Sequence, residues 1–553
     1  MLNGKQKLFL GFFIFAIFLS HGASALASDF FVDYSYDLYE RKKISTEHVL
    51  SRGILQMHID RDYFNSISRE ERNEIEKALL NLAKEFETII YPRLTSLFGE
   101  GPSGEITVIF HQIRHGSGGY FNPGDQYSKY QYPRSNEGNF LYLNVFHIQS
   151  RLLPAYLAHE FTHLITFNQK DNINRVTEEV WLNELRAEYA MTYLGYDDKY
   201  NGSNLEKRVS EFIINPNTSL TEWTNIRGDY TTVNLFAQYL VDHYGVQILA
   251  DSLKSPYVGI ESINYALSRG GFKESFSDIF TDWTIALFLN DCDTGEKYCY
   301  KNRNLRDLRI FPQMTYLPQT RIAQVIVSVS IKEWSGNWQR ITGGDGKLTL
   351  IFNGEEGFNF KVPYLICRNN GDCSVNFLGL DDKQNGRLII EDFKGYSLTI
   401  IPSIQNKTKG FNGPERTYRF SFDVSTKKEE IIEDEERREL LEKIEFLQKE
   451  VERLKAQLED ILRQRGAYCS INNNLYFGMM NSSEVRCLQE ILKREGVYPE
   501  GYITGNFLSL TRNAVIRLQE KYASEILYPL GLESGTGYVG EKTRIKINPL
   551  FSY

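Results

Sequence analysis

The amino-acid sequence predicts a multidomain α+β protein: a small mixed sheet with a helical half, a β-sandwich, a coiled coil and a small helical C-terminal module. Its 553 residues exceed what one hydrophobic core usually holds. Strand-like and helix-like patterns mix up to residue 317, and short alternating runs replace them between residues 320 and 424. A charge-dense heptad segment without Gly or Pro then covers residues 427–465.

Residues 1–27 predict a signal peptide, and therefore a secreted or envelope-associated protein. Lys5 and Lys7 form a basic start, residues 8–19 are an apolar run, and Ala25-Leu26-Ala27 offers small residues for cleavage. The apolar run is short for a bilayer span. An uncleaved membrane anchor is the alternative.

The net charge argues against one class of partner, and the cysteines predict disulfides. The formal net charge of -8 argues against a phosphate-tracking protein, so no nucleic-acid partner is expected. In an exported chain, six cysteines in close pairs predict three disulfides, with free thiols in a reducing compartment as the alternative. The pairs are Cys292 with Cys299, Cys367 with Cys373, and Cys469 with Cys487.

Residues 28–317 combine strand and helix patterns and are the predicted catalytic domain. Strands are expected at residues 53–59, 105–113 and 139–145, and helices at 69–90, 149–168, 177–194, 231–244 and 262–290. Residues 320–424 follow as the β-sandwich, because Gly and Asn punctuate their alternating runs.

The segment at residues 427–465 is the predicted coiled coil. Leu440, Leu447, Leu454 and Ile461 recur every seven residues, with Ile444, Val451 and Leu458 between them. This pattern favours a two-stranded coil and hence a homodimer. A solitary, charged spacer helix is the alternative.

The motif that carries chemistry is HExxH, at His159-Glu160-Phe161-Thr162-His163, inside a predicted helix. Residues four apart share a helix face, so both imidazoles can bind one metal ion. Zinc suits this set, since it accepts neutral imidazole and lowers the pKa of a water bound to it. Glu160 is the expected general base. Two histidines satisfied by polar neighbours are the alternative.

A second predicted helix supplies candidates for the missing ligand. Glu184 lies about twenty residues after His163 and offers the third ligand, and Glu188, one turn later, can support a ligand imidazole by a hydrogen bond. An exchange of these two roles stays open, as does an ordinary helix glutamate at position 188.

HExxH followed by Trp181-Leu182-Asn183-Glu184 resembles the gluzincin metallopeptidases, and residues 116–121 and 135–137 are similar to hyicolysin-type secreted bacterial peptidases. The resemblance covers residues 105–291 and implies Glu184 as third zinc ligand and Glu160 as base. The stretch at 230–240 is similar in frame to one in aminopeptidase N-type enzymes, which implies Tyr230 as donor to the oxyanion. A packed aromatic is the alternative.

Two further features shape the expected activity. No GxMEN motif is present, which favours internal cleavage over amino-terminal trimming. The substrate is expected to bind along residues 139–145 as an edge strand, at Leu141, Leu143 and Val145.

The C-terminal module, residues 469–550, resembles the peptidoglycan-binding-like helical domain, on motifs such as residues 485–489, 496–501 and 535–540. Leu508 and Leu518 depart from the usual Gly and Phe of that family. The resemblance implies peptidoglycan as a partner, with a protein-contact module as the alternative.

Together these features predict a secreted zinc endopeptidase acting on a protein or peptide substrate and targeted to the cell envelope. A non-catalytic zinc-containing adaptor and a peptidase acting on cell-wall peptides are the rival hypotheses.

Overall fold

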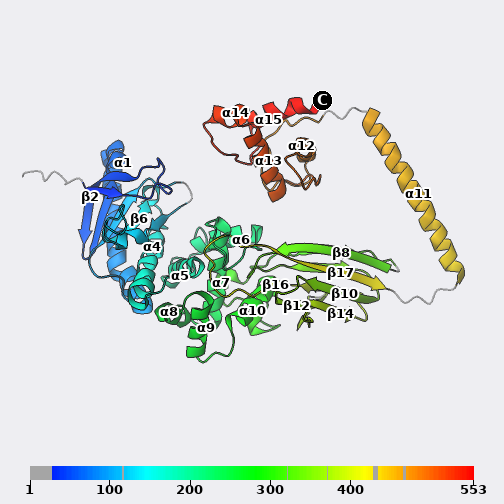
Figure 1. Cartoon of the computed structure of the whole chain (residues 1–553), viewed down its shortest axis with the longest axis horizontal. Coiled ribbons are helices and arrows are strands. Elements are labelled where there is room, and N and C mark those ends of the chain that lie inside the picture. The colour runs from blue at the N-terminus through cyan, green and yellow to red at the C-terminus, as the bar shows by residue number, and fades with distance from the viewer. Residues whose placement is uncertain are drawn as a thin grey trace, which may run out of the picture. The chain divides into compact units, whose positions relative to one another are not determined.

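The computed structural model describes residues 28–114, 117–320, 322–369, 371–427, 434–464 and 469–552. The chain divides into two compact units, Met1–Glu430 and Ile431–Tyr553. Figure 1 shows a mixed sheet, a group of helices and paired sheets in the first unit, and helices in the second. The predicted multidomain α+β architecture is confirmed at this level. The predicted signal peptide lies outside the described residues.

A six-stranded mixed sheet begins the first unit, in the order β1-β2-β3-β4-β6-β5. Its central strands β3, β4 and β6 run parallel and are buried on both faces, as their continuous apolar runs require. The strands are β1 (Ser28–Phe31), β2 (Lys43–Arg52), β3 (Leu55–Asp60), β4 (Ile106–His111), β5 (Gly119–Phe121) and β6 (Asn139–Asn144).

The prediction that residues 139–145 form the edge of the sheet is wrong. β5 pairs antiparallel with β6 and occupies the edge, placing Gly119 opposite Leu143 and Phe121 opposite Leu141. Leu141, Leu143 and Val145 are buried. A three-residue strand carries too little alternation to be recognised in the sequence.

Helices pack against this sheet and form the middle part of the first unit. They are α1 (Arg61–Ser66), α2 (Arg69–Glu85), α3 (Tyr91–Phe98), α4 (Leu153–Phe167), α5 (Val180–Tyr193), α6 (Asn204–Ile214), α7 (Arg227–Tyr244), α8 (Gln247–Lys254), α9 (Gly259–Arg269) and α10 (Phe276–Leu289). The helix expected at residues 262–290 is two helices, because Gly270 and Gly271 interrupt it and Gly271 adopts a φ of +81°.

Two sheets pack face to face after the helices and share one core, with Leu350 and Phe422 from one sheet and Leu398 and Ile400 from the other. Their orders are β14-β10-β17-β8 and β13-β12-β15-β9-β7, and β11 pairs with β16. The strands are β7 (Gln313–Leu317), β8 (Ile322–Ile331), β9 (Gln339–Gly343), β10 (Lys347–Gly354), β11 (Phe360–Lys361), β12 (Pro363–Arg368), β13 (Cys373–Phe377), β14 (Asn385–Ile390), β15 (Tyr396–Ile400), β16 (Ser403–Ile404) and β17 (Tyr418–Lys427).

The sandwich is joined to the helical half by buried residues of its own segment, such as Trp334, Trp338 and Phe411, that pack into the core of the helices. Trp334 packs edge-on against Phe276 and Phe280 of α10, and the indole N–H of Trp338 donates to the Thr284 carbonyl. These buried contacts explain why the helical half and the sandwich form one unit.

The second unit holds the long helix α11 (Asp434–Gln464) and a small helical module with its own core. The module contains α12 (Ser483–Arg494), α13 (Ser509–Lys521), α14 (Ala523–Ile526) and α15 (Glu541–Ile547).

The three predicted disulfides are confirmed: Cys292–Cys299, Cys367–Cys373 and Cys469–Cys487. Within the described part of the chain, every helix is too short or too polar to cross a membrane.

Candidate metal centre

Helix α4 brings the two histidines of the motif together. Apolar side chains bury this helix on nearly all sides, and His159 and His163, one turn apart, have ring centroids 4.8 Å from each other. Both imidazoles therefore project from one face of α4 into the adjoining cleft.

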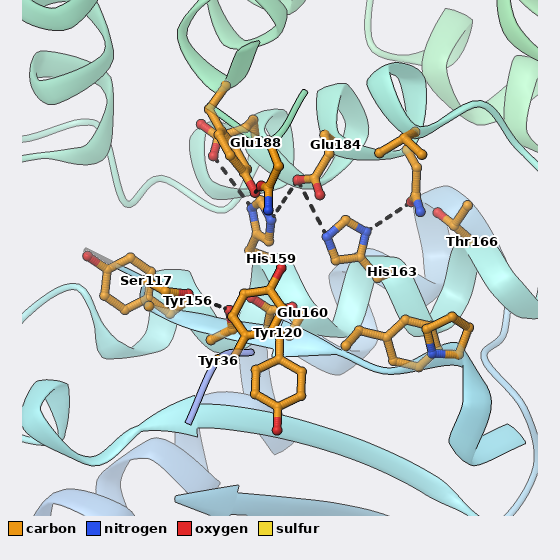
Figure 2. Close-up of a pocket in the computed structure, with 18 of the residues that line it drawn as sticks. Tyr36, Ser117, Tyr120, Tyr156, His159, Glu160, His163, Thr166, Glu184 and Glu188 are labelled. Carbon is orange, nitrogen blue, oxygen red and sulfur yellow. Dashed lines mark hydrogen bonds and ion pairs between the residues drawn. The ribbon is translucent and has the colours of Figure 1, made fainter. Parts of the chain in front are cut away.

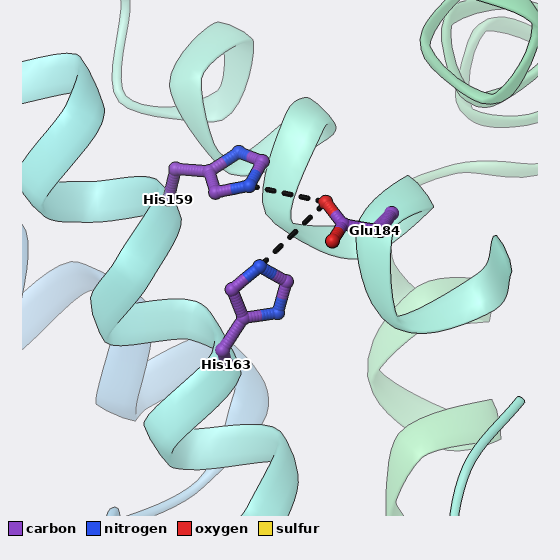
Figure 3. Close-up of side chains that lie close together, drawn as sticks. All are labelled: His159, His163 and Glu184. Atoms are coloured by element: carbon purple, nitrogen blue, oxygen red, sulfur yellow. Dashed lines mark hydrogen bonds and ion pairs between the residues drawn. The ribbon is translucent and has the colours of Figure 1, made fainter. Parts of the chain in front are cut away.

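Helix α5 supplies the carboxylate that faces them. The Glu184 Oε2 atom lies 3.2 Å from His159 Nε2 and 3.6 Å from His163 Nε2. The three ligand atoms all lie within 4.8 Å of one another, the only such group of three or more His, Cys, Asp or Glu side chains among the described residues. Figure 3 shows the two imidazoles on one helix directed at Glu184 on its neighbour. This buried group can hold a metal ion.

Each imidazole has a polar neighbour on the side of its Nδ1 atom. The Nδ1 atom of His163 lies 3.0 Å from Asn183 Oδ1, which accepts a hydrogen bond from Nδ1–H and so leaves Nε2 available as a ligand atom. On the other ring, Nδ1 of His159 lies 3.7 Å from Glu188 Oε1. Figure 2 shows the contact between His159 and Glu188 beside Glu184.

Glu188 is held on its far side by a cation. Arg208 donates from Nε to Oε2 over 2.9 Å and from its terminal nitrogen to Oε1 over 2.6 Å. Asn204 and Asn234 also donate to Oε2. Burial alone would raise the pKa of Glu188, but Arg208 and His159 outweigh it and lower that pKa to about 2. A carboxylate engaged in this way fits a supporting role better than metal ligation.

Glu160 lines the same cleft and is 95% buried, with a relative exposure of 5%. Its pKa is raised to about 8, chiefly by burial and further by the Glu184 and Glu188 carboxylates, whereas His159 opposes the rise. The Glu184 and Glu188 carboxylates therefore disfavour a third negative charge on Glu160. A divalent cation held by His159, His163 and Glu184 would favour that charge instead, so the donor set fits a bound metal.

Tyr230, on α7, lines the cleft as well. Its hydroxyl donates to Asn225 Oδ1 over 3.0 Å, and the Arg208 guanidinium lies 5.1 Å from its ring centroid. Burial raises its pKa, and the charge of Glu184 raises it further. The side chain therefore remains a protonated hydrogen-bond donor.

The cleft around His159, His163 and Glu184 has a volume of about 700 Å³. Tyr36, Tyr120 and Tyr156 contribute to its wall, as Figure 2 shows. Gly119 of β5 is required beside the site, since a Cβ atom there would lie 2.5 Å from the Tyr142 carbonyl oxygen and 3.1 Å from Glu160 Cγ. The sheet edge and the general-base candidate thus lie so close together that no side chain fits between them at this position.

Several residues of the site carry no local sequence signal. Tyr36 lies far upstream, and Arg208, Asn204 and Asn234 come from helices whose packing brings them to Glu188. Asn183, in contrast, directly precedes Glu184 on the same helix. Its place next to a candidate ligand is the sequence signal that could have identified it as a partner of His163.

Comparisons with known proteins add no family. Neither a protein-family model nor a curated protein matches the chain. Among solved structures, the mitogen derived from Yersinia pseudotuberculosis is similar to 20% of this chain and 90% of its own, at 13% identity and a TM-score of 0.14. So low a TM-score carries no argument about fold or function.

Proposed function

We propose that the protein is a zinc metallopeptidase that cleaves internal peptide bonds. The observation that carries this proposal is the convergence of two imidazole nitrogens and the Glu184 carboxylate beside the buried Glu160, in an open cleft. A structural zinc site normally has four protein ligands, whereas three leave a position for water or substrate.

Zinc is the metal proposed because two neutral imidazoles and one carboxylate are a ligand set that it binds readily. His159, His163 and Glu184 would hold it. When bound, zinc acts as a Lewis acid toward a carbonyl oxygen and lowers the pKa of water.

The remaining chemistry belongs to the side chains of the cleft. Glu160 takes the proton of the attacking water and returns it to the leaving amide nitrogen. The Tyr230 hydroxyl, 3.0 Å from Asn225 in the structure, turns to donate to the developing oxyanion. Asn183 and Glu188 keep the two imidazoles in the tautomer and orientation that ligation needs.

The outer side of β5 is the proposed substrate-binding edge. Among the described strands of this sheet, β5 pairs on one side alone, with β6. An extended peptide could add to its free side through backbone hydrogen bonds. Glu160 lies close to this strand, since a Cβ atom at Gly119 would be 3.1 Å from its Cγ atom.

Export and attachment to the cell envelope complete the proposal. The signal-like residues 1–27 and three disulfides are typical of an exported chain. The C-terminal module has a separate core, and peptidoglycan is its proposed ligand.

The decisive test compares the wild-type protein with Glu160→Gln. We expect both to bind one zinc ion, while cleavage of casein and of a peptide library falls at least 1,000-fold in the variant, because the base is lost. Chelator should abolish wild-type cleavage.

Substrates distinguish the rival functions. Digestion of purified peptidoglycan without cleavage of casein would favour a wall peptidase. Zinc binding without turnover of any of these substrates would favour the non-catalytic adaptor and contradict the proposed activity.

A further inference from the structure

Helix α11 carries an apolar stripe that no described residue covers. Five side chains on one face have relative exposures between 46% and 59%: Leu440, Ile444, Leu447, Val451 and Leu454. The sequence continues the pattern at positions 458 and 461. So large an apolar stripe is unfavourable in water unless another helix packs on it.

The spacing of the stripe indicates what covers it. Apolar side chains that alternate three and four residues apart keep one seam facing a partner helix that supercoils with it. Ile444 and Val451 occupy the first seam position, and Leu447 and Leu454 the second. β-branched residues at the first position with leucine at the second favour a parallel, two-stranded coil.

The charges beside the seam are complementary to a second copy of the same helix. In a parallel, in-register pair, a residue just before the first seam position meets the residue five places later in the partner. Glu450 then faces Lys455 of the second copy, and the reciprocal contact forms as well. The preceding pair, Lys443 with Gln448, brings no like charges together.

These charges are free to exchange partners. Glu450 is paired with Arg453, and Lys455 with Glu452, in ion pairs on the surface of the same helix. Exposed pairs of this kind contribute little to stability, so contacts across the seam can replace them at small cost.

We propose that the protein forms a parallel, in-register homodimer through α11. The 31-residue helix would supply a coil about 46 Å long, at 1.5 Å per residue. Each dimer then carries two C-terminal modules, so binding to a polymeric surface gains from multivalency. This inference does not depend on the metal centre.

The first experiment measures the mass of the mature full-length protein in solution by sedimentation equilibrium. We expect twice the mass of one chain, and at least a 30-fold rise in the dimer dissociation constant for Leu447→Lys. The matched control is Phe446→Lys, whose exposed side chain, at 66%, lies beside Leu447 but off the seam. It should remain dimeric.

A monomeric wild-type protein would overturn the inference. Equal weakening by both substitutions would overturn it too, because the stripe would then have no special role. Helix content by circular dichroism shows that each variant is folded.

The second experiment determines orientation with single cysteines. All six native cysteines are in disulfides, so an introduced thiol is the only free one. In a parallel pair, Leu440→Cys and Leu454→Cys each cross-link to their own copy. An antiparallel pair allows self-cross-linking at no more than one of them, because the positions lie about 21 Å apart along the helix. Cross-linking at only one position would refute the parallel arrangement.

A charge exchange tests the register. Glu450→Lys alone should raise the dissociation constant about 3- to 10-fold, and adding Lys455→Glu should restore it. If the double variant is as weak as the single one, these residues do not meet.

Discussion

At the scale of single residues, the candidate site rests on the different surroundings of two glutamates on one helix. Glu184 faces the Nε2 atoms of both histidines, at 3.2 and 3.6 Å. Glu188, one turn later, is held by Arg208 and two asparagines. The same residue type therefore suits metal ligation at one position and support of a ligand at the other.

This difference predicts unequal effects of matched substitutions. Glu184→Gln should weaken zinc binding more than 1,000-fold, since a ligand is lost, whereas Glu188→Gln should weaken it about 10- to 100-fold. Zinc affinity is measured by competition with a chromophoric chelator. Glu261→Gln, at an exposed position on α9, is the control. The reverse ranking would show that Glu188 is the ligand.

Gly119 gives a second prediction at this scale. Gly119→Ala places a methyl group 2.5 Å from the Tyr142 carbonyl oxygen, so β5 must shift. We expect a loss of about 1–3 kcal/mol in the free energy of unfolding and at least a 10-fold loss of peptidase activity. Gly379→Ala has no heavy atom within 4 Å and serves as the control. An unchanged activity in Gly119→Ala would refute a role for this edge in binding substrate.

At the scale of elements, the sandwich contacts the start of the helix that carries Glu184. The buried Glu179 carboxylate, at the N-terminal end of α5, accepts hydrogen bonds from the Trp181 indole over 2.7 Å and from the Gly410 backbone N–H. The Val180 N–H donates to Asn412. The loop between the last strands of the sandwich thus helps to set the position of α5.

Glu179→Ala is therefore predicted to act on the metal centre from outside it. The buried Trp181 indole N–H loses its acceptor, which costs about 1–3 kcal/mol, and the exposed Gly410 N–H loses its acceptor at a smaller cost, because water can replace it. We expect a Tm lower by several degrees and a zinc affinity reduced about 3- to 10-fold, because Glu184 lies little more than one turn further along α5. Thermal unfolding with and without zinc measures both. A lower Tm with unchanged zinc affinity would show that the contact stabilises the fold alone.

At the scale of the whole molecule, the two compact units divide the proposed tasks. Residues 1–430 contain the candidate metal centre together with the sandwich, which contacts the start of α5, and residues 431–553 contain α11 and the C-terminal module. Each of the two units has a hydrophobic core of its own. Cleavage chemistry and attachment should therefore be separable.

Deleting residues 431–553 tests this separation. The truncated protein should cleave soluble peptides within about 2-fold of the wild-type rate, since every residue of the site lies in the first unit. It should no longer sediment with purified peptidoglycan. A folded but inactive truncated protein would contradict the modular arrangement.

The local sequence by itself determined the parts of this protein that depend on short spacings. A separation of four residues places His159 and His163 on one helix face, and short loops bring the paired cysteines within bonding distance. In the same way, alternating apolar residues indicated the strands of the sandwich and heptads indicated α11. Each of these patterns depends on which residues share one face of a single element.

Only the tertiary structure decided which distant elements meet. It placed β5 outside β6, brought Arg208 and Asn234 to Glu188, put Tyr36 in the cleft wall and joined Trp334 to α10. Such contacts depend on how whole helices and sheets pack against each other. They also depend on which strand forms backbone hydrogen bonds with the outermost strand of the sheet. No periodicity within a single segment encodes that choice, so the edge predicted at residues 139–145 was wrong, whereas the residues of the HExxH motif converge as their spacing predicted.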